Sequence, residues 1–135
     1  MNMSKKPAKT DAVYSYLVKC ASQMRTCTYG EVGKALNIAP IGLGLNQLCY
    51  IRDICRVAGL PLLSVLCVQA PTRNAGQPGD GFVPGPIQSY LSAAGKESYV
   101  RAHKQAAFTF DWSMLDWSAL CVEFGPQIAT LYDAA

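Results

Sequence analysis

The 135-residue sequence lacks any apolar run that approaches the length of a membrane-spanning helix. Such a helix needs roughly 18 or more apolar residues in succession, so we expect no membrane partner. The first ten residues carry three lysines but no apolar segment follows them, so we expect no secretory signal and predict a cytoplasmic protein. Because half of the residues are hydrophobic, the chain is expected to fold around one core.

Closely spaced metal ligands are also absent. The six cysteines stand at positions 20, 27, 49, 55, 67 and 121, and no pair has the two- to four-residue gap of a zinc site. Most of them lie in apolar patterns, where a free cysteine behaves as a small hydrophobic residue. We therefore predict buried free thiols, with disulfides or a metal site as the alternative. No cofactor is expected.

Histidine is represented once, by His103. Arg101 and Lys104 flank it and would disfavour its protonation if they lie close by. No serine or cysteine can be paired with it from spacing alone, so we predict a surface or structural role. Three carboxylates that could coordinate a metal have no spacing that demands one: Asp80, Glu97 and Asp111.

Basic residues are missing from the end of the chain. Residues 1–109 hold all twelve bases and five acids, a net charge of +7, whereas residues 110–135 hold four acids and no base, a net charge of −4. A basic body favours a polyanionic partner, with an ordinary solvated surface as the alternative. The acidic end is expected to pack against the basic body or to face a partner.

The N-terminal half is predicted to be helical after a basic, flexible arm at residues 1–9. Apolar positions at helical spacing predict an amphipathic helix over 11–24, capped by Thr10. Thr28 and Glu31 have the spacing of a capping box and predict a second helix over 28–36. Its end is predicted at Asn37, in the left-handed conformation.

A third helix is predicted over 41–58, between Pro40 and Gly59. Its apolar stripe is expected to contain Leu45, Leu48, Cys49, Ile51, Ile54, Cys55 and Ala58. Its polar face is expected to contain Asn46, Gln47, Tyr50, Arg52, Asp53 and Arg56. Gly42 and Gly44 weaken the beginning of this helix.

The remaining pattern predicts an α+β fold. Leu62 to Val68 is rich in strand-forming residues, a turn-rich stretch follows to Gly85, and Phe82-Val83 is the expected returning strand. This order is that of a winged helix-turn-helix, here over residues 10–83 of a single domain 10–135.

The C-terminal extension, residues 84–135, is predicted to be helical and aromatic. A helix is expected to begin at Pro86 and to break at Gly95, a second helix covers 97–107, and residues 108–110 alternate like a short strand. Asp111 or Ser113 would then cap a final turn that contains Trp112, Leu115 and Trp117. Both tryptophans are predicted to be core or interface anchors, and a homodimer formed through them is a further expectation.

The stretch from Thr26 to Phe82 resembles the DNA-binding half of the O6-alkylguanine DNA alkyltransferase and alkyltransferase-like family. Thr28, Tyr29 and Gly30 match the family's opening to its first DNA-binding helix. Arg56 falls at the family's arginine before an asparagine-proline-x-proline turn, of which Pro61 keeps the last proline. The resemblance implies a winged helix that binds duplex DNA.

The residues of the family's chemistry are missing. Its proline-cysteine-histidine-arginine strand is replaced here by Val65-Leu66-Cys67-Val68, so Cys67 is one position out of register and no histidine follows it. The arginine that the family inserts into the base stack falls on Cys49. The resemblance therefore implies the scaffold without alkyl transfer, and we predict a protein that is not an enzyme.

The leading hypothesis is non-catalytic binding of duplex DNA by helix 41–58 and a wing at 70–81. In a helix-turn-helix the second helix enters the major groove, and asparagine, glutamine and arginine read base edges there. The candidate DNA-binding residues are Tyr29, Lys34, Asn46, Gln47, Tyr50, Arg52, Arg56 and Arg73. An ordinary polar helix face is the alternative for this set.

Two other functions stay open. The first is a small protein-interaction or inhibitor module, of the DNA-mimic or anti-defence type, whose acidic C-terminal face resembles nucleic acid. The second is an enzyme that uses Cys67 or His103. A nuclease is supported by composition alone.

Overall fold

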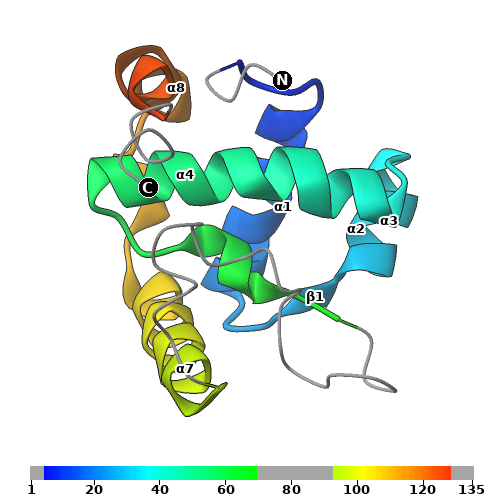
Figure 1. The fold of residues 1–135 in the computed structure, drawn as a ribbon, viewed down its shortest axis with the longest axis vertical. Coiled ribbons are helices and arrows are strands. Elements are labelled where there is room, and N and C mark those ends of the chain that lie inside the picture. Colours follow the sequence, from blue (N-terminus) through cyan, green and yellow to red (C-terminus); the bar gives the residue numbers. More distant parts are fainter. Residues whose placement is uncertain (1–4, 70–92, 129–135) are drawn as a thin grey trace.

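The computed structural model describes residues 5–69 and 93–128, and helices dominate these ranges (Figure 1). The one sheet described has two short parallel strands, so the fold is α+β at this coarse level. The elements, in chain order, are α1 (Thr10–Ser22), β1 (Cys27–Thr28), α2 (Tyr29–Leu36), α3 (Pro40–Gly42), the π-helical turn η1 (Leu43–Gln47), α4 (Leu48–Ala58), the 3-10 turn η2 (Leu63–Leu66), β2 (Cys67–Val68), α7 (Ala93–Thr109), the 3-10 turn η4 (Trp112–Met114), α8 (Trp117–Phe124) and the 3-10 turn η5 (Gly125–Gln127). The predicted wing, the returning strand and the helix expected at Pro86 lie outside the described residues.

Helix α1 confirms the predicted amphipathic helix but corrects its cap. Thr10 is a buried residue of the helix itself, and its hydroxyl donates a hydrogen bond to the Pro7 carbonyl oxygen at 2.6 Å. Lys9 precedes the helix in the left-handed conformation, with a φ of 65°. The apolar face of the helix, including Val13 and Leu17, is fully buried.

Helix α2 begins and ends where the sequence predicts. The Thr28 side chain accepts a hydrogen bond from the Glu31 backbone N–H at 3.1 Å. The Glu31 carboxylate, expected to return to the Thr28 backbone, lies 3.9 Å from the Arg25 guanidinium. Asn37 ends the helix with a φ of 56°. This residue is followed by a short turn, and Pro40 then opens the next helix at a position that suits proline.

Residues 40–58 form one continuous helical run, which we call the 40–58 helix; it consists of α3, η1 and α4. The π-helical turn η1 holds more residues per turn than an α-helix, so side chains before it are rotated relative to those after it. The predicted apolar stripe is therefore wrong at its beginning. Leu45 is 63% exposed, whereas Leu43 and Gln47 face the interior.

The predicted strand 62–68 is mostly wrong. Leu63–Leu66 is a buried 3-10 turn that packs against α1, α4 and α7, and only Cys67–Val68 is extended. These two residues pair in parallel with β1, in the register Cys27 to Cys67. The strand before α2 and the strand after the 40–58 helix are thereby joined.

The C-terminal extension is more helical than predicted. Gly95 lies inside α7 and does not break it, and residues 108–109 are the end of that helix rather than a strand. The Asp111 side chain caps η4 by accepting from the Ser113 backbone N–H, as expected. A second aspartate, Asp116, caps α8 in the same way.

An aromatic cluster joins this extension to α1. The Trp117 ring stacks on the Tyr14 ring, with centroids 4.1 Å apart and an interplanar angle of 11°. The Trp117 indole N–H donates to the Asp11 carboxylate at 2.9 Å. The Trp112 and Tyr14 rings form a T-shaped pair, with centroids 6.4 Å apart and an interplanar angle of 81°. Both tryptophans are core anchors, as predicted.

All six cysteines are free, and every one except the half-buried Cys49 is buried, so the predicted buried thiols are confirmed. Within residues 5–69 and 93–128, no helix is both long and apolar enough to cross a membrane.

Candidate functional site

The structure separates the predicted DNA-binding residues. Three lie in α2 or in η1 and are exposed or half-buried: Tyr29, Lys34 and Asn46. Three are buried, with side chains at most 8% exposed: Gln47, Tyr50 and Arg52. Arg56 is exposed near the other end of the helix. Arg73 lies outside the described residues. Only part of the expected polar face of the 40–58 helix is therefore exposed to solvent.

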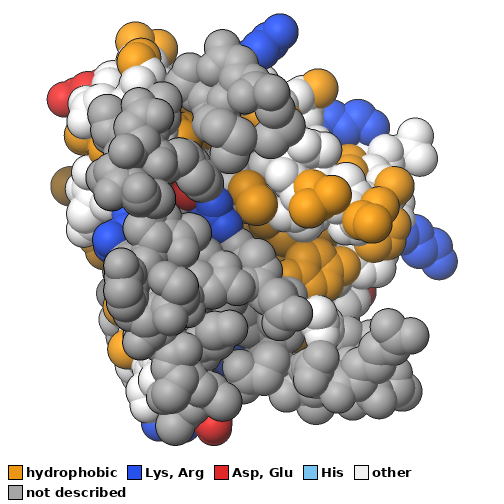
Figure 2. All heavy atoms as spheres, viewed as in Figure 1, with side chains coloured by type: hydrophobic (Ala, Val, Ile, Leu, Met, Phe, Trp, Pro, Cys, Tyr) orange, Lys and Arg blue, Asp and Glu red, His pale blue; other side chains and the backbone are white. Residues whose placement is uncertain are grey.

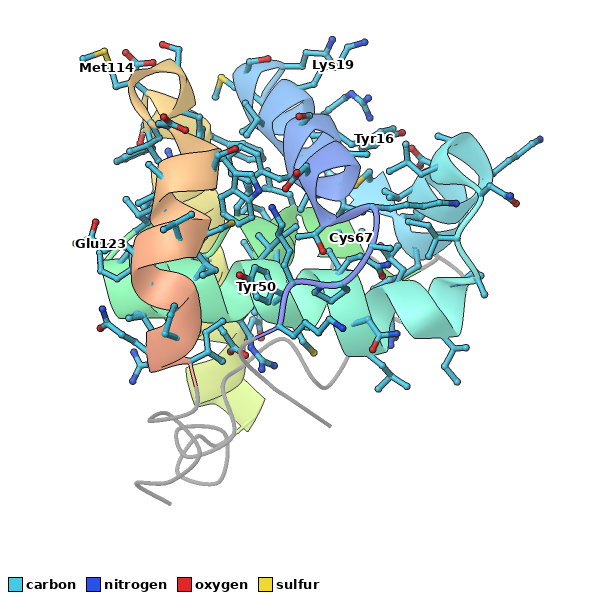
Figure 3. All side chains as sticks on the ribbon, turned by 90° about the horizontal axis from the view of Figure 1, so that it is seen from above. Tyr16, Lys19, Tyr50, Cys67, Met114 and Glu123 are labelled. Atoms are coloured by element: carbon cyan, nitrogen blue, oxygen red, sulfur yellow. The ribbon has the colours of Figure 1, made fainter. Side chains whose placement is uncertain are left out.

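Residues 5–9 and α8 cover the middle of the 40–58 helix (Figure 3). The Gln47 side-chain amide donates to the Ala8 carbonyl oxygen at 2.9 Å. Tyr50 lies on the side of α4 that faces α8, where burial and then the neighbouring Cys121 thiol raise the pKa of its hydroxyl. Residues 5–9, expected as part of a flexible arm, are thus held against the helix.

Arg52 is committed to an internal ion pair. Its Nε donates to the Asp53 Oδ1 at 2.9 Å, and the side chains are 6% and 2% exposed. Removing one partner of a buried pair strands the other charge and costs about 3–5 kcal/mol. The loss of Arg52 would therefore disturb folding before it could report on DNA binding.

The beginning of the 40–58 helix is open and largely apolar. Ile41 is 76% exposed and Leu45 is 63% exposed. A Cβ atom added at Gly44 would lie 3.7 Å from the Tyr29 ring, so this ring rests against the helix backbone. A Cβ added at Gly42 would lie 3.9 Å from the Asn46 side-chain nitrogen. We call Tyr29, Ile41, Leu45 and Asn46 the leading surface.

Figure 2 shows hydrophobic side chains gathered over this end of the molecule, with basic side chains at the edge of the patch. In Figure 1 the same end of the 40–58 helix lies beside α2 and away from α7 and α8. The described part of the C-terminal extension, residues 93–128, therefore leaves the leading surface uncovered.

The turn between α2 and the 40–58 helix is held tightly. A Cβ atom at Gly33 would lie 2.5 Å from the Ile38 carbonyl oxygen, so only glycine permits this approach of helix and turn. The Lys9 ammonium donates to the carbonyl oxygens of Leu36 and Asn37 at 3.0 and 2.9 Å. These contacts satisfy the C-terminal carbonyls of α2. The leading surface thus has a rigid support, and the exposed Lys34 stands next to Gly33.

His103 has a structural contact in this molecule. Its Nδ1 accepts a hydrogen bond from the Leu62 backbone N–H at 3.0 Å. Burial, and then the charge of Arg56, lower the pKa of His103. The charge that acts on it comes from α4, whereas the sequence suggested its neighbours Arg101 and Lys104.

The cysteine of the family-like strand lies in the core. Cys67 is fully buried beside Cys27, and a thiol–thiol hydrogen bond followed by burial raises the pKa of Cys27. Burial also raises the pKa of Cys20 to about 11. Among the described side chains, no group of histidine, cysteine, aspartate and glutamate residues could hold a metal ion.

Ile41 and Leu45 are the surface residues that the sequence did not single out. Leu45 fits an apolar stripe at ordinary helical spacing, and only the π-helical turn moves it to the surface. The available signal was three apolar residues, Ile41, Leu43 and Leu45, that alternate with Gly42 and Gly44. Small residues there leave the helix backbone open around the larger side chains.

Comparisons of the chain with protein-family models, curated proteins and solved structures found no match. The resemblance to the alkyltransferase-like family therefore depends on the sequence motifs alone, Thr28-Tyr29-Gly30 with Arg56 and Pro61.

Proposed function

We propose that the protein is a non-catalytic winged-helix module that binds duplex DNA through its leading surface. The observation that carries the proposal is the open beginning of the 40–58 helix, set at a fixed angle to α2 by the Gly33 contact. In a helix-turn-helix, the first residues of the second helix are those that reach base edges. The pairing of β1 with β2 joins the chain that precedes α2 to the chain that follows the 40–58 helix, which holds the two helices together at that end.

The charge distribution supports a polyanionic partner. Residues 5–69 hold eight basic and three acidic residues, a net charge of +5. Lys34 is exposed in the last turn of α2, the helix that packs beside the beginning of the 40–58 helix. Contacts to phosphates supply most of the affinity of such proteins and fix their register, whereas base contacts supply specificity.

Because the middle of the 40–58 helix is covered, only its beginning is available to contact DNA bases. Gln47, Tyr50 and Arg52 are engaged inside the protein, so base contacts come only from the first two turns. We therefore propose binding dominated by phosphates, with a short stretch of base reading. The buried Cys67 supports a proposal without thiol chemistry.

The test is the salt dependence of duplex binding, measured by fluorescence anisotropy. Affinity should fall steeply as salt rises, and Lys34→Ala should weaken binding and reduce the slope of log affinity against log salt by about 1. Lys19→Ala is the matched control because Lys19 lies on α1 and points to solvent away from α2 (Figure 3). The absence of binding to any duplex at low salt would contradict the proposal.

A second candidate is a protein-interaction module, because Ile41 and Leu45 form an exposed apolar pair. A DNA-mimic version is less well supported, since Asp111 and Asp116 accept hydrogen bonds from backbone N–H groups as helix caps. A pull-down from the native host, with and without nuclease, separates the two candidates. A protein partner retained after nuclease treatment, with no salt-sensitive duplex binding, would favour the second.

A further inference from the structure

The side chains available at the leading surface differ in chemistry from the predicted base readers. The two large exposed side chains, Ile41 and Leu45, are apolar, and Asn46 is the exposed amide beside them. We propose that the leading surface recognises the C5-methyl groups of pyrimidines in the major groove. It would then favour thymine over uracil and 5-methylcytosine over cytosine. This inference rests on the proposed DNA binding and names the feature of the duplex that is read.

The leading surface presents an apolar pair that suits contact with methyl groups. Ile41 and Leu45 are four residues apart and so lie about one turn apart on one side of the helix. The thymine methyl is the apolar group on the major-groove edge of the base pairs, and apolar side chains contact it there. Burial of the methyl against Ile41 or Leu45 removes apolar surface from water on both partners.

The polar side chains of the 40–58 helix differ in whether they are available to contact a base. Asparagine pairs with the N6 and N7 atoms of adenine, the partner of thymine. The Asn46 amide lies over Gly42, where a Cβ atom would be 3.9 Å from its nitrogen, and it is exposed. Arginine is the usual reader of guanine, but Arg52 is bound to Asp53 in the interior. The leading surface therefore suits an A·T pair better than an unmethylated G·C pair.

Charge argues for DNA as the occupant of this apolar surface. Basic side chains border the patch in Figure 2, and Lys34 is exposed on α2, the helix that packs beside the beginning of the 40–58 helix. The N-terminal body, residues 5–69, carries a net charge of +5. A basic rim around an apolar centre matches a groove in which phosphates flank methyl groups.

The experiment compares duplexes that differ only in methyl groups. One A·T-rich sequence is prepared with thymine or with uracil, and one CG-rich sequence with cytosine or with 5-methylcytosine. Anisotropy titrations are made at one low salt concentration. Each buried methyl should strengthen binding by about fourfold, which corresponds to about 0.8 kcal/mol.

The variants Ile41→Ala and Leu45→Ala test whether these residues read the methyl groups. They should reduce the thymine-to-uracil ratio toward one while the protein still binds the uracil duplex. Val122→Ala is the matched control, because Val122 is an apolar residue of α8 that is 80% exposed. It should leave the ratio unchanged.

Three results would overturn the inference. Equal binding of methylated and unmethylated duplexes would overturn it while the proposed DNA binding stands. A methyl preference that survives in both alanine variants would show that other residues read the methyl group. No binding to any of the duplexes would overturn both the proposed function and this inference. If, in that case, a protein partner is captured and the capture requires Ile41, the second candidate function is favoured.

Discussion

At the residue scale, one imidazole nitrogen joins α7 to the chain that follows the 40–58 helix. His103 can accept from the Leu62 N–H only when Nδ1 is unprotonated. Burial and the neighbouring Arg56 both favour the neutral ring. The lowered pKa in the folded protein therefore links its stability to pH.

We expect stability to fall as the pH is lowered through the unfolded-state pKa of about 6.5. Below that value the unfolded chain binds a proton that the folded protein resists, so unfolding is favoured, with a limiting slope of about 1.4 kcal/mol per pH unit. Urea unfolding between neutral and mildly acidic pH measures this. His103→Asn keeps an acceptor oxygen without titrating, so it should lose this part of the pH dependence. An unchanged profile would count against the role assigned to His103.

At the element scale, α2 contains two glycines with opposite roles. Gly33 faces the Ile38 carbonyl oxygen so closely that a Cβ atom would lie 2.5 Å from it. Gly30 is exposed in the first turn, and the nearest atom to a Cβ there is the Thr28 Oγ1, at 3.9 Å. Helix propensity favours alanine at both positions, but the geometry permits it at only one.

Gly33→Ala should destabilise the protein by about 1–3 kcal/mol, because the turn must move away from α2. Gly30→Ala should leave stability unchanged or raise it by up to about 1 kcal/mol. Thermal or denaturant unfolding of both variants checks the pair. Equal effects of the two substitutions would mean that the close approach at Gly33 does not control the turn. If the proposed function holds, Gly33→Ala should also weaken DNA binding.

At the scale of the whole molecule, α7 and α8 belong to the same packed body as α1 and α4. Trp117 stacks on Tyr14 and donates to Asp11, which joins residues more than 100 positions apart. This packing covers one side of the 40–58 helix and decides how much of that helix remains open. Helices α7 and α8 therefore shape the candidate interface without forming part of it.

Trp117→Ala should cost about 3–5 kcal/mol of unfolding free energy, because it removes a large buried ring. Unfolding should remain a single transition, since the ring joins the extension to α1. Met114→Ala is the control: Met114 is 78% exposed, so its loss should change stability by no more than about 0.5 kcal/mol. A separate early transition in the tryptophan variant would show that the extension unfolds independently.

The sequence by itself determined the local features of this protein. Thr28 and Asn37 mark the ends of α2 because caps and left-handed stops depend on a few neighbouring atoms. The helical spacing of α1 and the apolar setting of the cysteines also predicted their burial. Such features need no knowledge of distant contacts.

The tertiary structure alone decided which side of the 40–58 helix is open. The π-helical turn rotated Leu45 outward, and residues 5–9 and α8 buried Gln47 and Tyr50. A hydrophobic period of 3.6 residues does not reveal that one turn of a helix holds an extra residue. The polarity of a side chain does not reveal that a distant segment of the chain covers it. The helix was predictable from local sequence, whereas its binding surface depends on long-range packing.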